Sequence, residues 1–183
     1  ELQAIFEFQS MISELTGMEA TNSSLYDGFA SLSEAVGLAA AVTKRNEIVL
    51  SQAVHTNARA VIHAAAKGRG LDVIEVLTEK DVTNFNVTRC LTTPDTAAIV
   101  VQYPNFFGSV EALAVVKKIA EDKGALLIVM ANPLALGILE APGNLGADIV
   151  VGDTQPFGLP MSFGGPHCGY FSVNQKHIRK VPG

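Results

Sequence analysis

Short apolar runs alternate with segments of helical periodicity along most of this 183-residue chain. The runs that we interpret as buried strands are residues 48–50, 73–76, 97–102, 125–130, 148–151 and 169–173. Strands that alternate with helices at this spacing indicate an α/β fold, with a mostly parallel sheet covered on both faces. The last three strands follow one another without full crossover helices, which leaves room for one of them to run antiparallel.

Four segments have apolar residues at the spacing of one helix face. They are residues 1–16, an alanine-rich segment that follows Gly28 and ends near 44–45, a segment that begins near 58 and ends at Gly68 or Gly70, and residues 112–124. Gly17 is a natural stop for the first helix. Residues 81–94 show no clear pattern, so their structure is left open.

Composition limits the class of protein. Hydrophobic residues make up 48% and charged residues 17% of the chain, and the mean hydropathy is +0.29, which excludes a disordered segment and predicts a single domain over 1–183. The formal charge is −5 and there is no basic tract, so nucleic-acid binding is not expected. The uncharged, mostly apolar run 124–139 is too short and too interrupted for a membrane span.

The two ends of the chain and its cysteines indicate whether the domain is truncated and in which compartment it is expected. It has no initiator methionine, begins on a helical pattern and stops at a turn, so we expect a domain truncated at both ends. Cys90 and Cys168 are too few for a disulfide framework, and no signal peptide is recognised, so a cytoplasmic location is expected. The high apolar content predicts an exposed apolar patch that a partner covers.

Ligands of a parallel sheet bind beyond the carboxyl ends of its strands. The loop 22–28, with Asn22, Ser24, Tyr26, Asp27 and Gly28, opens a helix and offers hydroxyls and free N–H groups, as phosphate sites do. An ordinary helix cap by Asp27 or Ser24 explains the same residues and is preferred from this segment alone. Neither a G-x-G-x-x-G nor a P-loop motif is present, which disfavours nicotinamide enzymes and P-loop NTPases.

His55 follows the strand 48–50 on the side where ligands bind. It is either a catalytic group or, more commonly at such a position, a structural hydrogen-bond donor. His167, Cys168 and His177 do not have a usual metal-ligand spacing, so no metal site is predicted. The Phe-Gly-Gly-Pro-His run at 163–167 is explained by a tight turn.

Several short motifs carry a family resemblance. They are Leu15-Thr16-Gly17-Met18-Glu19, residues 22–28, Ser33-Glu34-Ala35, Asn132-Pro133-Leu134 with Leu136-Gly137, Gly146-Ala147-Asp148-Ile149 and Ser162-Phe163-Gly164-Gly165-Pro166. Together, and over essentially the whole chain, they resemble the amino-terminal half of the glycine cleavage system P-protein, which many bacteria make as a separate polypeptide, subunit 1. The resemblance implies the large domain of a fold-type-I pyridoxal-phosphate (PLP) transferase. It also implies seven mostly parallel strands, one antiparallel strand near the end of the sheet, helices on both faces and a short first strand at 18–21.

The family reaction decarboxylates glycine with PLP as electron sink and transfers the aminomethyl group to the lipoyl arm of the H-protein. Alignment on the family motifs places Gln155 at the position of the Schiff-base lysine, and no lysine occurs in residues 124–175. The aspartate that pairs with the pyridine nitrogen falls near Ala131 or Asn132, neither of which is acidic. His55 matches the residue whose ring stacks on PLP in relatives.

The resemblance therefore implies a subunit that does not bind PLP covalently and completes an active site with the PLP-bearing subunit 2. The expected partners are subunit 2, the lipoyl arm of the H-protein and glycine, in a bacterial or archaeal cytoplasm, and the isolated fragment is expected to be inactive. The candidate residues for contact with the partner's cofactor are Asn22, Ser24, Tyr26, Asp27, Gly28 and His55. The alternative is a purely structural pseudo-enzyme subunit that stabilises subunit 2, whose side chains do not reach that cofactor.

Overall fold

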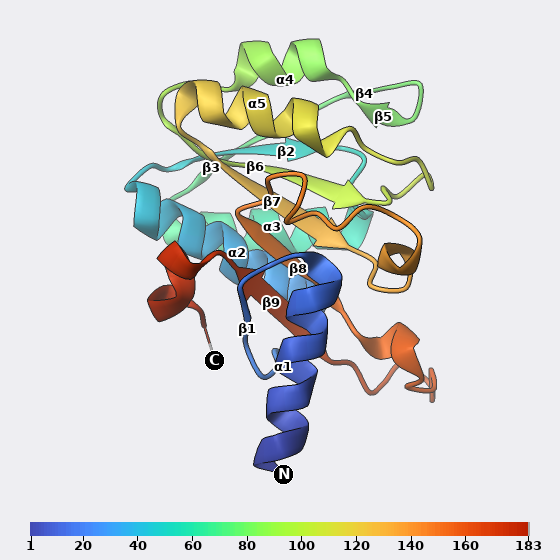
Figure 1. Cartoon of the computed structure of the whole chain (residues 1–183). Helices are drawn as coiled ribbons and strands as arrows, with labels where there is room; N and C mark the ends of the chain where they lie inside the picture. The colour runs from blue at the N-terminus through green and yellow to red at the C-terminus, as the bar shows by residue number, and fades with distance from the viewer. Residues whose placement is uncertain (183) are drawn as a thin grey trace.

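One seven-stranded sheet runs through the computed structural model, which describes residues 1–182 (Figure 1). Its strands are β1 (Ala20–Thr21), β2 (Glu47–Ser51), β3 (Asp72–Val76), β6 (Thr96–Tyr103), β7 (Leu126–Ala131), β8 (Ile149–Asp153) and β9 (Gly169–Val173). The order across the sheet is β1-β9-β8-β7-β6-β2-β3, and the five strands from β8 to β3 pair in parallel. Strand β9 is antiparallel to both of its neighbours. The predicted mostly parallel sheet, its antiparallel strand and its short first strand are confirmed.

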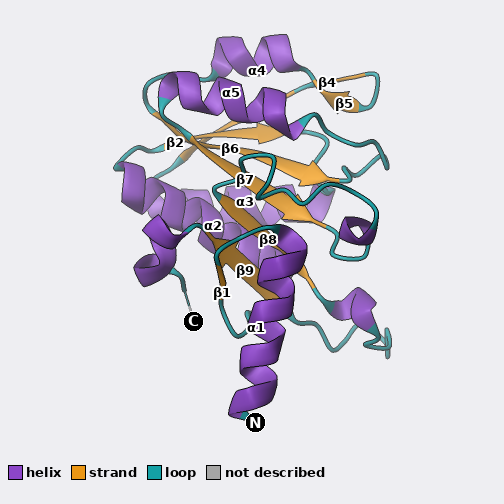
Figure 2. Cartoon of the chain, in the orientation of Figure 1, coloured by secondary structure: helices purple, strands orange, loops and turns teal. Residues whose placement is uncertain are grey.

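Helices lie on both faces of this sheet (Figure 2). They are α1 (Leu2–Thr16), α2 (Gly28–Thr43), α3 (Thr56–Arg69), α4 (Phe85–Leu91) and α5 (Leu113–Lys123), with 3₁₀ turns η1 (Ala135–Gly137), η2 (Gln155–Phe157) and η3 (Gln175–Lys180). Helices α1, α4 and α5 pack on one face, and α2 and α3 on the other. The stretch 81–94, left open by the sequence, contains α4 and the second strand of a hairpin, β4 (Thr78–Glu79) and β5 (Val82–Thr83). No helix in residues 1–182 is both long and apolar enough to cross a bilayer.

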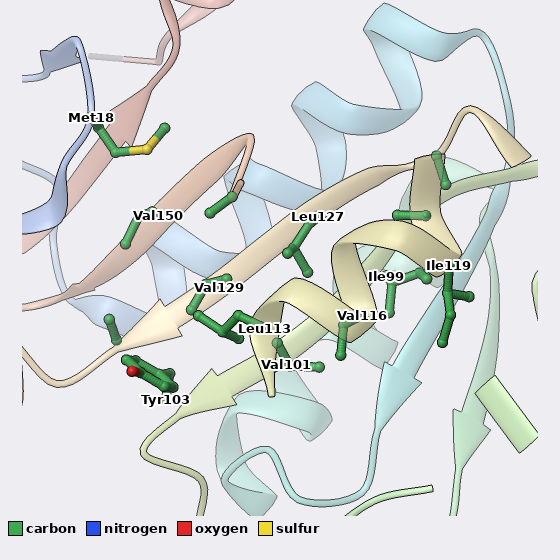
Figure 3. Close-up of a cluster of buried hydrophobic side chains, with 14 of the residues drawn as sticks. Met18, Ile99, Val101, Tyr103, Leu113, Val116, Ile119, Leu127, Val129 and Val150 are labelled. Atoms are coloured by element: carbon green, nitrogen blue, oxygen red, sulfur yellow. The ribbon is translucent and has the colours of Figure 1, made fainter. Parts of the chain in front are cut away.

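Two hydrophobic cores form because successive residues of each buried strand point to opposite faces. In β2, Val49 belongs to the core under α5, whereas Ile48 and Leu50 belong to the core under α2 and α3. Figure 3 shows the first core, where Leu113, Val116 and Ile119 of α5 lie over Ile99, Val101, Leu127 and Val129 of the central strands. The central strands β6, β7 and β8 are thus apolar along most of their length, as expected for strands covered on both sides, whereas the edge strand β3 is only partly buried.

Two glycines allow strands β8 and β9 to approach their neighbours. A Cβ atom at Gly169 would overlap the carbonyl group of Asp27, and one at Gly152 would overlap the carbonyl oxygen of Ala131 and lie 2.7 Å from the Tyr170 ring. Tyr170 is fully buried, and its hydroxyl donates to the Ala131 carbonyl oxygen at 2.9 Å. Burial raises the pKa of this phenol, which therefore remains a neutral donor beneath the carboxyl ends of β7 and β8.

A buried carboxylate fixes the other end of β8. Asp148, 2% exposed at its side chain, accepts hydrogen bonds from Lys117 Nζ at 2.8 Å, from Lys176 Nζ at 2.8 Å and from the Leu127 N–H at 3.0 Å. Burial by itself raises the pKa of Asp148, but the hydrogen bonds from the two lysines and Leu127 outweigh it and hold the pKa below its usual value. Asp148 therefore joins α5, β7, β8 and η3 as an ion-paired group.

Candidate functional site

Two adjoining cavities lie at the carboxyl ends of the central strands, where sheets of this kind bind ligands. The first has a volume of about 220 Å³ and is lined by Asp27, Gly28, Phe29, Met130, Asp153, Gln155, Pro156 and His167. The second has a volume of about 170 Å³ and is lined by Gln102, Met130, Ala131, Asn132, Pro133, Asp153 and Pro156. Because they share Met130, Asp153 and Pro156, we treat them as one site and call it the cleft.

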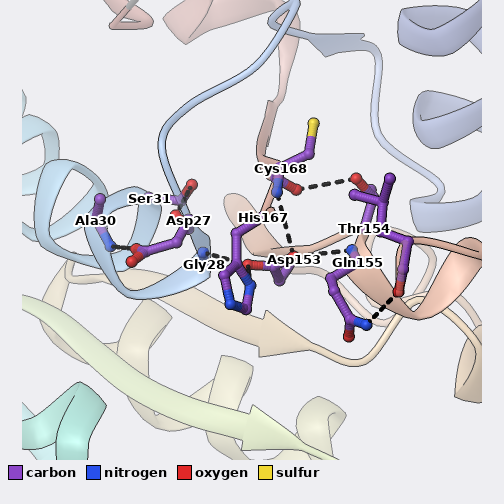
Figure 4. Close-up of polar contacts among 10 residues, drawn as sticks. Asp27, Gly28, Ala30, Ser31, Asp153, Thr154, Gln155, His167 and Cys168 are labelled. Atoms are coloured by element: carbon purple, nitrogen blue, oxygen red, sulfur yellow. Dashed lines mark hydrogen bonds and ion pairs between the residues drawn. The ribbon is translucent and has the colours of Figure 1, made fainter. Parts of the chain in front are cut away.

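Asp153, the last residue of β8, is the most connected side chain of the cleft (Figure 4). Its Oδ1 accepts hydrogen bonds from the backbone N–H of Gln155 at 2.8 Å and of Cys168 at 3.4 Å. Its Oδ2 accepts from the N–H of Gly28 at 3.1 Å and lies 3.1 Å from His167 Nδ1. One carboxylate thus joins the start of α2, the turn after β8 and the segment that leads into β9.

A second carboxylate stands at the same helix start. Asp27 is the N-cap of α2, and its Oδ1 accepts a hydrogen bond from the Ala30 N–H at 2.6 Å. The cap interpretation of the loop 22–28 is therefore confirmed for Asp27, and Ser24 plays no part in the cap. A Cβ atom at Gly28 would lie 3.0 Å from Gly152 and 3.1–3.2 Å from Asp153, so the first turn of α2 packs directly on the end of β8.

His55 lies beside the cleft at the start of α3. Its Nδ1 accepts a hydrogen bond from the Asn57 N–H at 3.1 Å, and its own N–H donates to Gln102 Oε1 at 2.8 Å. The imidazole ring lies 5.2 Å from the Phe29 ring and meets the Phe106 ring edge-on at 5.1 Å. Because Nδ1 is an acceptor, the neutral ring carries its proton on Nε2, which remains available as a donor.

The other candidates from the loop separate into two groups. Ser24, Tyr26 and Asp27 line an open hollow that also includes the turn 164–167, and Tyr26 is 87% exposed. Asn22 is instead buried: its Oδ1 accepts from the Phe171 N–H at 3.1 Å and its Nδ2 donates to the Pro182 carbonyl at 3.2 Å. Both polar atoms of the Asn22 amide therefore bind backbone groups of this chain.

Local sequence patterns do not mark Asp153, Gln102 or His167 as cleft residues. Asp153 could have been found as a carboxylate that ends an apolar strand, on the side where ligands bind. The sequence around His167 predicts only a turn, because the pairing of His167 with Asp153 depends on how two loops meet. Among residues 1–182, no three histidine, cysteine or carboxylate side chains converge in a way that could hold a metal ion.

A larger hollow, which we call the apolar groove, lies between α1 and the turn η2. Its volume is about 840 Å³, and it is lined by Phe8, Met11, Ile12, Leu15, Thr154, Phe157, Gly158, Leu159 and Cys168. Met11 is 62% and Phe157 50% exposed, and Phe6, Met161 and Phe163 nearby in the chain are also exposed. The exposed apolar surface expected from the composition is therefore present on this side of the domain.

Comparison with known proteins identifies the family. A family model described as "Glycine cleavage system P-protein" matches residues 1–183. The probable glycine dehydrogenase (decarboxylating) subunit 1 of Brevibacillus brevis is 58% identical over 184 residues, and that of Bacillus pumilus is 56% identical over 183 residues. This chain belongs to the glycine cleavage system P-protein family. Both alignments include 100% of the chain but only 41% of the relative, so the chain spans less than half the length of these P-proteins.

Solved structures agree with this family and its fold. A glycine decarboxylase (P-protein) of the glycine cleavage system, in inhibitor-bound form, superimposes with a TM-score of 0.95 at 43% identity, over 100% of this chain and 41% of that one. A sphingosine-1-phosphate lyase of Burkholderia pseudomallei shares the fold with a TM-score of 0.78 at 16% identity, over 94% and 45% of the two chains. The fold is the large domain of fold-type-I PLP-dependent enzymes, as the resemblance implied.

The cleft of this P-protein chain does not fit covalently bound PLP. Gln155 is the second residue after β8, and its Nε2 donates to the Leu159 carbonyl at 2.6 Å. No lysine is among the residues that line the cleft, so no amine is placed to form a Schiff base. Asn132, which follows β7, offers an amide rather than a carboxylate to a pyridine nitrogen, and its Oδ1 already accepts from the Leu134 N–H at 3.0 Å.

Proposed function

We propose that this chain is part of subunit 1 of a cytoplasmic glycine decarboxylase from a bacterium or archaeon. In this proposal the complex releases carbon dioxide from glycine and transfers the aminomethyl group to the lipoyl arm of the H-protein, with PLP bound to subunit 2. The observation that carries the proposal is a P-protein fold in which β8 leads into Gln155 instead of a lysine. A chain without that amine needs a partner for PLP chemistry.

We propose that this chain contributes side chains to such an active site. They are side chains that remain accessible because hydrogen bonds within the chain do not use all of their polar atoms. Tyr26 is almost fully exposed, and His55 presents an Nε2 donor from a ring fixed by Phe29 and Phe106. These groups are placed to orient a substrate or cofactor held mainly by subunit 2. The apolar groove is the surface that we assign to contact with that partner, because exposed apolar surface of this extent favours association.

The cofactor assignment is tested by borohydride reduction of the complex of full-length subunits 1 and 2. Reduction converts a Schiff base to a stable secondary amine, and peptide mass spectrometry then locates the phosphopyridoxyl group. We expect one such lysine on subunit 2 and no stoichiometric modification of subunit 1, because no lysine lines the cleft. A single lysine of subunit 1 that is modified one-to-one would refute the assignment.

A second candidate is a purely structural subunit that holds subunit 2 in its active shape. The observation that favours it is that the side chains of Asp27, Asp153 and Gln155 are all hydrogen-bonded within the chain. His55→Ala distinguishes the candidates: a contributing histidine predicts turnover lower by about tenfold or more, with unchanged association. His63→Ala is the matched control, because His63 lies on the exposed surface of the same helix and pairs with Glu75. Unchanged turnover in His55→Ala would favour the structural subunit.

A further inference from the structure

The start of α2 is a position where a protein of this shape could bind a phosphate. Unpaired N–H groups and the helix dipole attract anions to the beginning of a long helix, and α2 has 16 residues. Its first residues, Gly28 and Phe29, line the cavity of about 220 Å³. The group that already occupies these N–H donors determines whether an external anion can bind there.

Two carboxylates of the chain itself hold the donors. Asp27 accepts the Ala30 N–H from within the loop, and Asp153 accepts the Gly28 N–H from a strand that lies 125 residues further along the chain. Figure 4 shows the two carboxylates on either side of the helix start. They occupy two of the first-turn N–H donors, those of Gly28 and Ala30, that a phosphate oxygen would use.

Asp153 is not free to move aside. Its two oxygens also accept from the N–H groups of Gln155 and Cys168 and contact His167, and its side chain is only 22% exposed. No lysine or arginine lines the cavity, and the imidazole of His167 is already paired with Asp153 Oδ2. An incoming phosphate would therefore meet like charges at close range, where repulsion is strong.

We propose that Asp27 and Asp153 act as an internal anion that closes the start of α2 to phosphate-bearing ligands, PLP included. The missing lysine removes only covalent attachment, whereas this closure also prevents noncovalent docking of the phosphate group. It further joins β8 to α2 through the chain's own residues. This inference goes beyond the proposed function, since it concerns anion binding by one polypeptide and not glycine turnover.

The experiment measures inorganic phosphate binding to the full-length subunit by calorimetry, with sodium chloride of equal ionic strength as the salt control. The variant Asp27→Ser/Asp153→Ser retains a good capping residue and frees the N–H groups of Gly28 and Gln155. We expect the variant to bind phosphate with a Kd of about 1 mM. The wild type should show no saturable phosphate binding up to about 10 mM, so the variant binds at least about tenfold more tightly. Phosphate, but not chloride, should also raise the Tm of the variant.

The matched control is Asp95→Ser/Asp122→Ser, which removes two exposed carboxylates next to the amino end of β6 and the end of α5. It should behave as the wild type does. A folded Asp27→Ser/Asp153→Ser variant that does not bind phosphate would overturn the proposal. Saturable phosphate binding by the wild-type subunit would also overturn the proposal. This measurement uses only the wild-type protein, so it does not depend on whether a variant folds. Neither outcome affects the test of glycine turnover.

Discussion

Asp148→Asn is expected to lower the free energy of unfolding of the subunit by about 3 kcal/mol. The substitution keeps the shape of the side chain but removes the charge that pairs with Lys117 and Lys176. The loss arises mainly at Lys117, whose side chain is only 18% exposed, because Lys176 is 55% exposed and can return to water. Denaturant unfolding of the wild type and the variant measures the difference. Asp122→Asn, an exposed substitution on the same helix as Lys117, should change stability by less than about 0.5 kcal/mol.

The same pair of proteins predicts a pH dependence. The pKa of Asp148 is below its usual value in the folded state, so the unfolded state takes up a proton first as the pH falls. The stability from this carboxylate is fully present above the ordinary aspartate pKa of about 4 and is lost below it. The difference between wild type and Asp148→Asn should therefore narrow as the pH falls below about 4. A difference that stays constant down to pH 2–3 would contradict the ion-pair explanation.

Most of the sheet could be predicted from the sequence because buried parallel strands are continuous apolar runs. All six apolar runs are strands in the structure. The ends of α1, α3 and α5 could be predicted because each helix ends at a glycine, Gly17, Gly70 or Gly124. Strand β1 has only two residues, too few to show a period, and was expected only from the family resemblance. The hairpin β4–β5 was missed for the same reason.

The cleft was less predictable than the fold. His55 and the cap at Asp27 follow from local sequence, since each lies at the start of a helix. The role of Asp153 depends on a contact with Gly28 across 125 residues, and that of His167 on where the turn 164–167 folds back. Sequence spacing does not contain this information. Asn22 could not be distinguished from its neighbours because its amide is used by Pro182, at the far end of the chain.

The most direct test of the central proposal is the release of labelled carbon dioxide from glycine by purified subunit 2 with H-protein, measured with and without the full-length subunit that carries this chain. Subunit 2 contains the PLP in this account, but its active site is completed only by the partner. We therefore expect a background rate from subunit 2 and H-protein alone. Addition of subunit 1 should raise the rate by about a hundredfold or more and saturate at one copy per subunit 2. A full rate without subunit 1 would show that this chain contributes nothing to glycine decarboxylation and would contradict the account.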